Sequence, residues 1–168
     1  MGYKAACTPG NLGGYLALIE RFGTTSLAET LKYAIEYAEG HPVSEALASA
    51  IAAQAEVLGR WPTSAALFLP DVRPNHLCLR LCSLADEGFF AQGRPPVVGE
   101  TWSNPGLANT LKRLVAAERL ALARGCTREQ GIRAAFDEFY TGAIAQDIAS
   151  FFQSGPPQNM LPAAHSCK

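Results

Sequence analysis

Charged side chains are scarce in this 168-residue sequence, because Asp, Glu, Lys and Arg make up only 17% of it, against about 25% in a typical soluble domain. The 14 Lys and Arg balance the 15 Asp and Glu, so the sequence lacks the basic excess of a nucleic-acid binder. The longest apolar stretches, such as residues 46–53, fall far short of the ~18 residues that span a membrane. A chain with few charges hides more of its surface than a free monomer does, which indicates a subunit or a fragment.

The sequence also lacks the common catalytic and metal-binding motifs, such as a phosphate-binding G-x-x-x-x-G-K-[ST] loop or an H-E-x-x-H pair. The five cysteines are odd in number and irregularly spaced, and Cys78 and Cys82, although near His76, have no second pair to complete a metal site. His41 and His165 are equally isolated. We therefore assign no catalytic, no cofactor-binding and no metal-ligating residue, and we expect no cofactor.

Three further features invite a functional interpretation but favour an ordinary one. The glycine-rich residues 10–14 lack both a preceding strand and the spacing of a dinucleotide-binding loop. Adjacent residues on a helix point in different directions, so Asp137 and Glu138 predict a solvated face rather than an acid–base dyad. His41 precedes a proline, and we expect it in a solvated loop.

Apolar residues recur at helical spacing along most of the chain, and no segment alternates as a strand would. Capping boxes begin two of the predicted helices, at Ser26 with Glu29 and at Thr127 with Gln130. The fold class is therefore mainly α, and the pattern predicts about six helices, near residues 12–23, 26–40, 44–58, 104–125, 127–139 and 142–152.

Several short motifs, in a fixed order, resemble the large subunit of the γ-glutamyltransferase (γ-glutamyltranspeptidase, glutathione hydrolase) family. They are Thr8-Pro9-Gly10, Gly14-Tyr15 and Glu20-Arg21-Phe22-Gly23; residues 31–43 (LKYAIEYAEGHPV); residues 67–71 (FLP within LFLPD) resumed at Gly93-Arg94-Pro95-Pro96; Gly99-Glu100; Asn104-Pro105 with Leu107-Ala108 and Thr110-Leu111; and residues 139–145 (FYTGAIA). The resemblance runs from about residue 8 to residue 153, without residues 72–92.

This resemblance implies the helical part of an N-terminal-nucleophile hydrolase with a four-layer αββα core. In that family a precursor cuts itself and exposes a threonine at the start of a small subunit, which attacks the γ-glutamyl amide of glutathione or a related compound. The free α-amine of that threonine acts as the base, and backbone N–H groups stabilise the oxyanion.

The family's catalytic groups have no counterpart here. The nucleophilic threonine lies far downstream of the matched motifs, and the arginine that binds the substrate carboxylate lies upstream of the Pro9-Gly10 turn. Thr24 and Thr25 fall in the loop after the first predicted helix, so neither is assigned as a nucleophile. We expect the chain by itself to be inactive, with the rest of the large subunit and the small subunit as its partners.

Two stretches depart from the family pattern. Residues 72–92 interrupt an otherwise continuous family loop, and residues 154–168 abandon the expected G-G run. We interpret residues 1–153 as a partial γ-glutamyltransferase-like domain interrupted by an insertion-like loop, and residues 154–168 as a divergent, disordered tail. Retained non-coding sequence or an imperfect gene boundary would produce both.

Two other interpretations stay open. The first is a fragment of a related cephalosporin or glutaryl acylase, and the second is a free-standing helical interaction module without chemistry. A module would bury its own apolar faces, whereas a fragment would expose a large apolar patch. The start of the sequence has no apolar run of a secretory signal, although family members are usually periplasmic, secreted or attached to the cell surface, so the compartment is unassigned.

Overall fold

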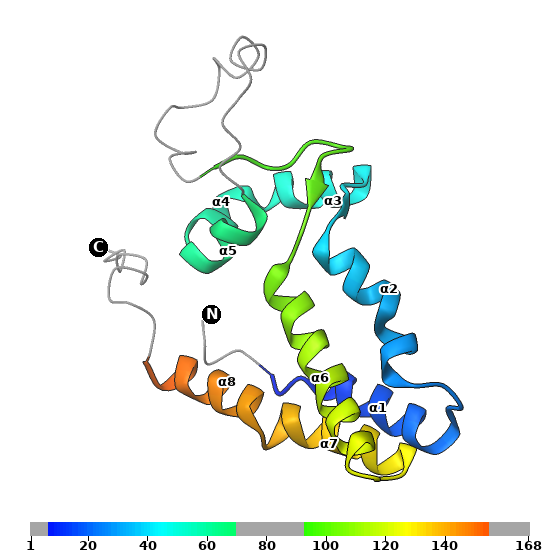
Figure 1. Ribbon diagram of the computed structural model, residues 1–168. Coiled ribbons are helices and arrows are strands. Elements are labelled where there is room, and N and C mark those ends of the chain that lie inside the picture. Colours follow the sequence, from blue (N-terminus) through cyan, green and yellow to red (C-terminus); the bar gives the residue numbers. More distant parts are fainter. Residues whose placement is uncertain (1–6, 70–92, 155–168) are drawn as a thin grey trace, which may run out of the picture. The chain divides into compact units, whose positions relative to one another are not determined.

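The computed structural model describes residues 7–69 and 93–154. These residues are mostly helical, which confirms the predicted fold class, and they fall into two compact units (Figure 1). Unit 1 contains residues 7–39 and 103–154, and unit 2 contains residues 40–69 and 93–102. The insertion-like residues 72–92 and, beyond Ser154, the predicted tail lie outside the described residues.

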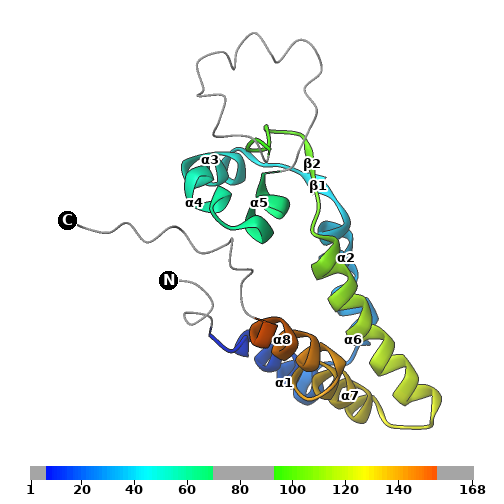
Figure 2. The same ribbon diagram turned by 90° about the vertical axis from the view of Figure 1, so that its left-hand side faces the viewer.

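Unit 1 is a bundle of five helices: α1 (Gly10–Phe22), α2 (Leu27–Glu39), α6 (Pro105–Ala123), α7 (Arg128–Tyr140) and α8 (Ala143–Ser154). Helices α2 and α6 run side by side, α7 packs on α6, and both α1 and α8 pack on α7 (Figures 1 and 2). The core is formed by buried apolar side chains from all five helices, namely Leu16, Leu27, Leu111, Leu114, Ile132, Ala135 and Ile144.

Two predicted helix starts of unit 1 are confirmed by their caps. Both reciprocal hydrogen bonds of a capping box join Thr127 and Gln130 before α7. The side chain of Asn104 accepts a hydrogen bond from the Leu107 amide, and Pro105 occupies the first turn of α6, where its missing N–H would have had no intrahelical partner. After α6 the chain reverses through Gly125, whose φ of 86° is the left-handed conformation that glycine adopts at a helix C-terminus.

Unit 2 consists of α3 (Glu45–Ala53), α4 (Ala55–Gly59) and α5 (Pro62–Phe68), together with the short strands β1 (His41–Pro42) and β2 (Thr101–Trp102). The two strands pair antiparallel, with His41 opposite Trp102 and Pro42 opposite Thr101 (Figure 2). A separate small core joins the three helices through Ile51, Ala55, Ala65 and Leu69.

Unit 2 differs in detail from the predicted elements. The helix predicted over residues 44–58 is interrupted at Gln54, whose φ of −110° and ψ of 8° leave the helical region and separate α3 from α4. Helix α5 includes Leu67 and Phe68, which the family resemblance places in a loop. Pro62 in the first turn of α5 favours a helix start there. The two-residue strands are too short to show the alternation that would have predicted them.

Candidate functional site

The acidic pair on α7 does not form a dyad. The carboxylate of Glu138 accepts a hydrogen bond from Arg113 of α6 at 2.9 Å, whereas Asp137 lies 3.7 Å from Arg133 of its own helix. Adjacent positions therefore serve different cationic partners, as the helical geometry predicts. The sequence holds a second adjacent acidic pair, Asp86 and Glu87, which lies outside the described residues.

The remaining candidate groups lie on separate segments of the chain. The glycine-rich residues 10–14 lie within α1 rather than in a loop after a strand. His41 is half-buried in β1, with its ring edge against Trp102 at a centroid distance of 5.6 Å, so it is packed rather than held in the predicted solvated loop. Cys7 and Cys126 are free thiols. Over residues 7–69 and 93–154, no cluster of His, Cys, Asp and Glu could hold a metal ion.

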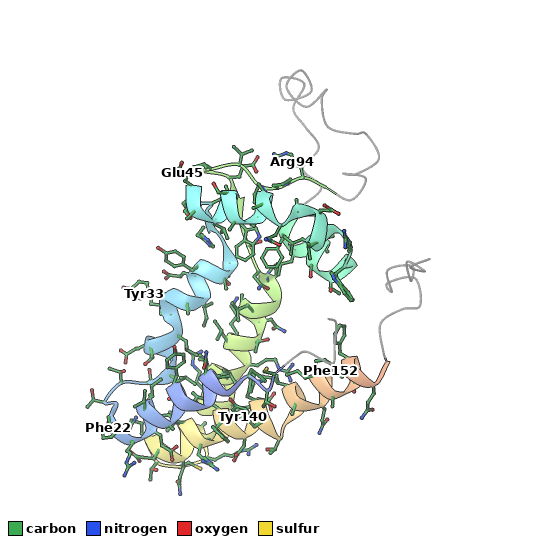
Figure 3. All side chains as sticks on the ribbon, turned by 180° about the vertical axis from the view of Figure 1, so that it is seen from behind. Phe22, Tyr33, Glu45, Arg94, Tyr140 and Phe152 are labelled. Atoms are coloured by element: carbon green, nitrogen blue, oxygen red, sulfur yellow. The ribbon has the colours of Figure 1, made fainter. Side chains whose placement is uncertain are left out.

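The phenol of Tyr140 connects the end of α7 to the beginning of α1. Its hydroxyl donates a hydrogen bond to the carbonyl oxygen of Pro9 at 2.6 Å and accepts one from the amide of Gly13 at 2.9 Å. Tyr140 lies where α1 runs along α7 (Figure 3), and Phe136 and Phe139 pack against its ring. The Pro9-Gly10 turn and the residues 139–145 motif, far apart in sequence, thus meet at one hydroxyl.

A second long-range anchor is the carboxylate of Glu118, which is only 1% exposed within α6. Both of its oxygens accept hydrogen bonds from the Leu27 amide, at 2.9 and 3.1 Å. Leu27 is the first residue of α2, so the buried charge lies at the positive end of that helix. This contact holds α2 against α6 and compensates part of the desolvation of the carboxylate.

Three helices of unit 1 meet at Arg113. Its guanidinium donates to Asp147 of α8 at 2.8 Å and to Glu138 of α7 at 2.9 Å. The hydrogen bond to Asp147, followed by that to Glu138, raises the pKa of Arg113 above its ordinary value. The planar guanidinium suits this double contact because its donors point in fixed directions.

In unit 2, Arg94 and Glu100 close the loop that leads into β2. The Arg94 guanidinium donates to both oxygens of the Glu100 carboxylate, and the Val97 amide donates to the same carboxylate at 2.8 Å. The hydrogen bond from Arg94 holds the pKa of Glu100 below its usual value, with a smaller contribution from Val97. The loop is tied to the segment after β1 by hydrogen bonds from Val43 to Glu100 and from Gly99 to Val43.

Two surface hollows of unit 1 are lined in part by charged side chains that already have partners. In the first, between α2 and α6, Lys112 forms an ion pair with Glu39. In the second, Arg128 donates to the carbonyl oxygens of Ile19 and Glu20 at the end of α1. Neither hollow brings together a nucleophile and a base, so neither resembles an active site.

Large apolar side chains are exposed on several helices of unit 1, among them α1. Tyr15, Leu18 and Phe22 are 62%, 56% and 72% exposed. Their spacing of three and four residues places them on one face of α1, beside the stripe of Leu12, Leu16 and Ile19 that packs in the core. Figure 3 shows Phe22 at the end of this helix.

The described residues thus define a class of chain: a mainly helical scaffold whose polar side chains cap helices and form ion pairs. The family model for "Gamma-glutamyltranspeptidase" matches residues 1–156, so the chain belongs to the γ-glutamyltranspeptidase family. The resemblance predicted from its motifs is therefore confirmed.

Curated relatives with the printed name "Acylase ACY 1 proenzyme", from Pseudomonas sp. strains SE83 and V22, are each 42% identical over 82 residues. That match covers 48% of this chain and 15% of each acylase. The solved structures of LmbA2991T421A and LmbA2991HD are similar in fold, with TM-scores of 0.63 and 0.62 and sequence identities of 33% and 32%. Each comparison covers 84% of this chain, which spans only 20% of either solved chain.

Proposed function

We propose that this chain is the helical part of the large subunit of an enzyme that transfers or hydrolyses γ-glutamyl groups, with glutathione or a related γ-glutamyl compound as substrate. The nucleophilic threonine, its α-amine base and the oxyanion-stabilising amides would come from the rest of that enzyme. The partners of this chain are accordingly the remainder of the large subunit and the small subunit. Residues 1–153 would form one partial family domain, interrupted at residues 72–92.

One observation carries the proposal. The family match runs through residues 1–156, while the polar side chains described above, such as Tyr140, Glu118 and Arg113, are engaged within the chain itself. Such side chains position helices but have no spare group to attack a carbonyl. The exposed apolar face of α1 supports a fragment over a free-standing module, because a module would cover that face.

The relatives favour a second candidate function, that of an acylase. The curated proteins at 42% identity bear the name acylase. None of the motifs matched in this chain holds the groups that would distinguish a γ-glutamyl from a glutaryl side chain. Both candidates use the same acyl-transfer chemistry and differ in whether the substrate carries an α-amino group.

Both candidates are tested by complementation. The full chain would be co-expressed with an ACY 1 proenzyme of strain SE83 from which the segment homologous to this chain is deleted. The complex would be assayed with γ-glutamyl-p-nitroanilide and glutaryl-p-nitroanilide, and the chain alone would be the control. Release from either substrate supports the role of this chain as the helical part of an acyl-transferring enzyme, because the groups that select the substrate come from the acylase part of this complex. Release from neither by a stable complex would contradict both.

A further inference from the structure

We infer that unit 2 is a separately folding insertion in unit 1, which opens and recloses cooperatively while unit 1 stays folded. Part of a protein opens in this way when it has its own core and buries fewer apolar side chains than the rest. The inference rests on how each unit is closed and packed, and it holds whether or not the chain serves a γ-glutamyl-transferring enzyme. It adds a conformational step that the proposed function does not include.

The chain leaves and re-enters unit 1 at two points that are hydrogen-bonded to each other. The Asn104 amide, at the N-cap of α6, donates to the carbonyl oxygen of Ala38 in the last turn of α2 at 2.7 Å. Lys112 of α6 also forms an ion pair with Glu39, the last residue of α2. Helices α2 and α6 are therefore held together by contacts within unit 1, and these contacts do not require unit 2 to be folded.

Unit 2 is closed by its own contacts. Its entering and leaving strands, β1 and β2, pair antiparallel (Figure 2), and the Val43 amide donates to the carbonyl oxygen of Glu100 at 2.8 Å. Trp102 of β2 connects this strand pair to α5. Its indole N–H donates to the carbonyl oxygen of Leu67 at 3.0 Å, and its ring stacks on Phe68 at a centroid distance of 5.9 Å. The strands and helices of unit 2 should therefore fold and unfold together.

The two cores differ in how much apolar surface they bury. Among the described residues, four buried side chains form the core of unit 2, and two of them are the small Ala55 and Ala65. The core of unit 1 draws on all five of its helices and includes Leu16, Leu114 and Ile132, each at most 1% exposed. Because hydrophobic stabilisation grows with the apolar area removed from water, unit 2 should be the less stable unit and should open first.

Two optical signals follow the two units separately. The sequence has two tryptophans, and both of them, Trp61 and Trp102, are half-buried in unit 2, so tryptophan fluorescence reports the unfolding of unit 2. Most of the described helical residues lie in unit 1, so far-UV circular dichroism reports mainly the unfolding of unit 1. A chain that unfolded as a single two-state unit would give the same transition by both signals.

The test is thermal unfolding of the full-length chain, followed by both signals, with two matched variants. Ile51→Ala truncates a side chain in the core of unit 2, and Ile132→Ala truncates one in the core of unit 1; the two isoleucines are 4% and 0% exposed. We expect the fluorescence midpoint of the unsubstituted chain to lie below the circular dichroism midpoint by roughly 4 °C or more. Ile51→Ala should lower the fluorescence midpoint by roughly 8 °C or more and leave the main circular dichroism midpoint in place, and Ile132→Ala should do the reverse.

Ile51→Val and Ile132→Val form a milder pair that should show the same pattern with smaller shifts if either alanine variant fails to fold. Coincident transitions in the unsubstituted chain, or an equal shift of both midpoints by Ile51→Ala or Ile51→Val, would overturn the inference. A fluorescence signal without a cooperative transition would overturn it as well, because a folding unit unfolds cooperatively. The complementation assay tests the proposed function separately, so failure of either proposal leaves the other standing.

Discussion

The hydroxyl of Tyr140 lies 2.9 Å from the amide nitrogen of Gly13, although the two residues are 127 positions apart. A Cβ atom at position 13 would come within 2.9 Å of that hydroxyl oxygen and 3.2 Å of the ring carbon that bears it. Glycine is therefore needed at position 13 so that α1 can approach α7 closely enough for this hydrogen bond. This hydrogen bond holds the first turn of α1 against the end of α7.

Removing the hydroxyl with Tyr140→Phe should lower the free energy of unfolding by about 1–2 kcal/mol, because the Pro9 carbonyl and the Gly13 amide both lose their partner. Gly13→Ala should be destabilising as well, since the added methyl group displaces the Tyr140 ring. Urea unfolding followed by far-UV circular dichroism measures both. Tyr15→Phe, at an exposed tyrosine of α1, is the matched control, and a loss equal to that of Tyr140→Phe would contradict the assignment.

The buried Glu118 carboxylate predicts an unequal response to two substitutions. Glu118→Gln keeps an acceptor for the Leu27 amide but removes the charge at the start of α2, and should cost about 1 kcal/mol. Glu118→Ala removes the acceptor and leaves a cavity, and should cost about 3 kcal/mol or more. Thermal and urea unfolding measure the difference. Glu36→Gln on the exposed side of α2 should be neutral, and equal effects of all three substitutions would contradict the capping role.

The ion pair between Arg94 and Glu100 predicts acid sensitivity of unit 2. The pKa of the Glu100 carboxyl is lowered in the folded chain. Glu100 therefore contributes stability that is complete above the unfolded carboxyl pKa of about 4.3 and is lost as pH falls through the lower folded pKa. Unfolding midpoints followed by tryptophan fluorescence should fall below about pH 4. In Glu100→Gln this component of the acid-dependent loss should disappear, with stability at pH 7 lower by about 1 kcal/mol after allowing for solvent screening. An unchanged pH profile would count against this origin.

Arg113 predicts a dependence on side-chain geometry rather than on charge alone. Arg113→Lys keeps the positive charge but cannot reach Glu138 and Asp147 together, and should lower the thermal midpoint by roughly 2–4 °C. The difference between the two proteins should shrink in 1 M NaCl, where charges are screened within about 3 Å. Arg60→Lys alters the exposed pair with Glu56 and should change the midpoint little. Equal shifts for both substitutions would argue against a special role of Arg113.

Local chemistry made much of the fold predictable. Thr127 with Gln130, and Asn104 with Pro105, mark helix starts through contacts within four residues, so the sequence alone predicts them. The contacts of Tyr140 and Glu118 join residues more than 90 positions apart, and the hydrophobic periodicity of the sequence does not predict them. Glu118 and Arg119 are the only charged residues within the otherwise apolar residues 114–122, and this is the local hint, because an unpaired buried carboxylate would be costly. The break at Gln54 was missed because alanines on both sides favour a continuous helix.

The absence of catalytic residues is a prediction from the missing motifs. The structure shows directly that Tyr140, Glu118 and Arg113 hold helices together. The sequence predicts that a fragment would expose an apolar patch, but it does not predict that this patch lies on α1. Its location depended on knowing which side of α1 packs on α7.

The central claim is that this chain supplies scaffold and not chemistry to a γ-glutamyl-transferring enzyme, and one assay tests it most directly. The purified full-length chain would be incubated with γ-glutamyl-p-nitroanilide, alone and in complex with the deleted ACY 1 proenzyme. We predict no release above background by the chain alone and release by the complex. Release by the chain alone that persists at constant specific activity through repeated purification would contradict the claim, because it would require a nucleophile within residues 1–168.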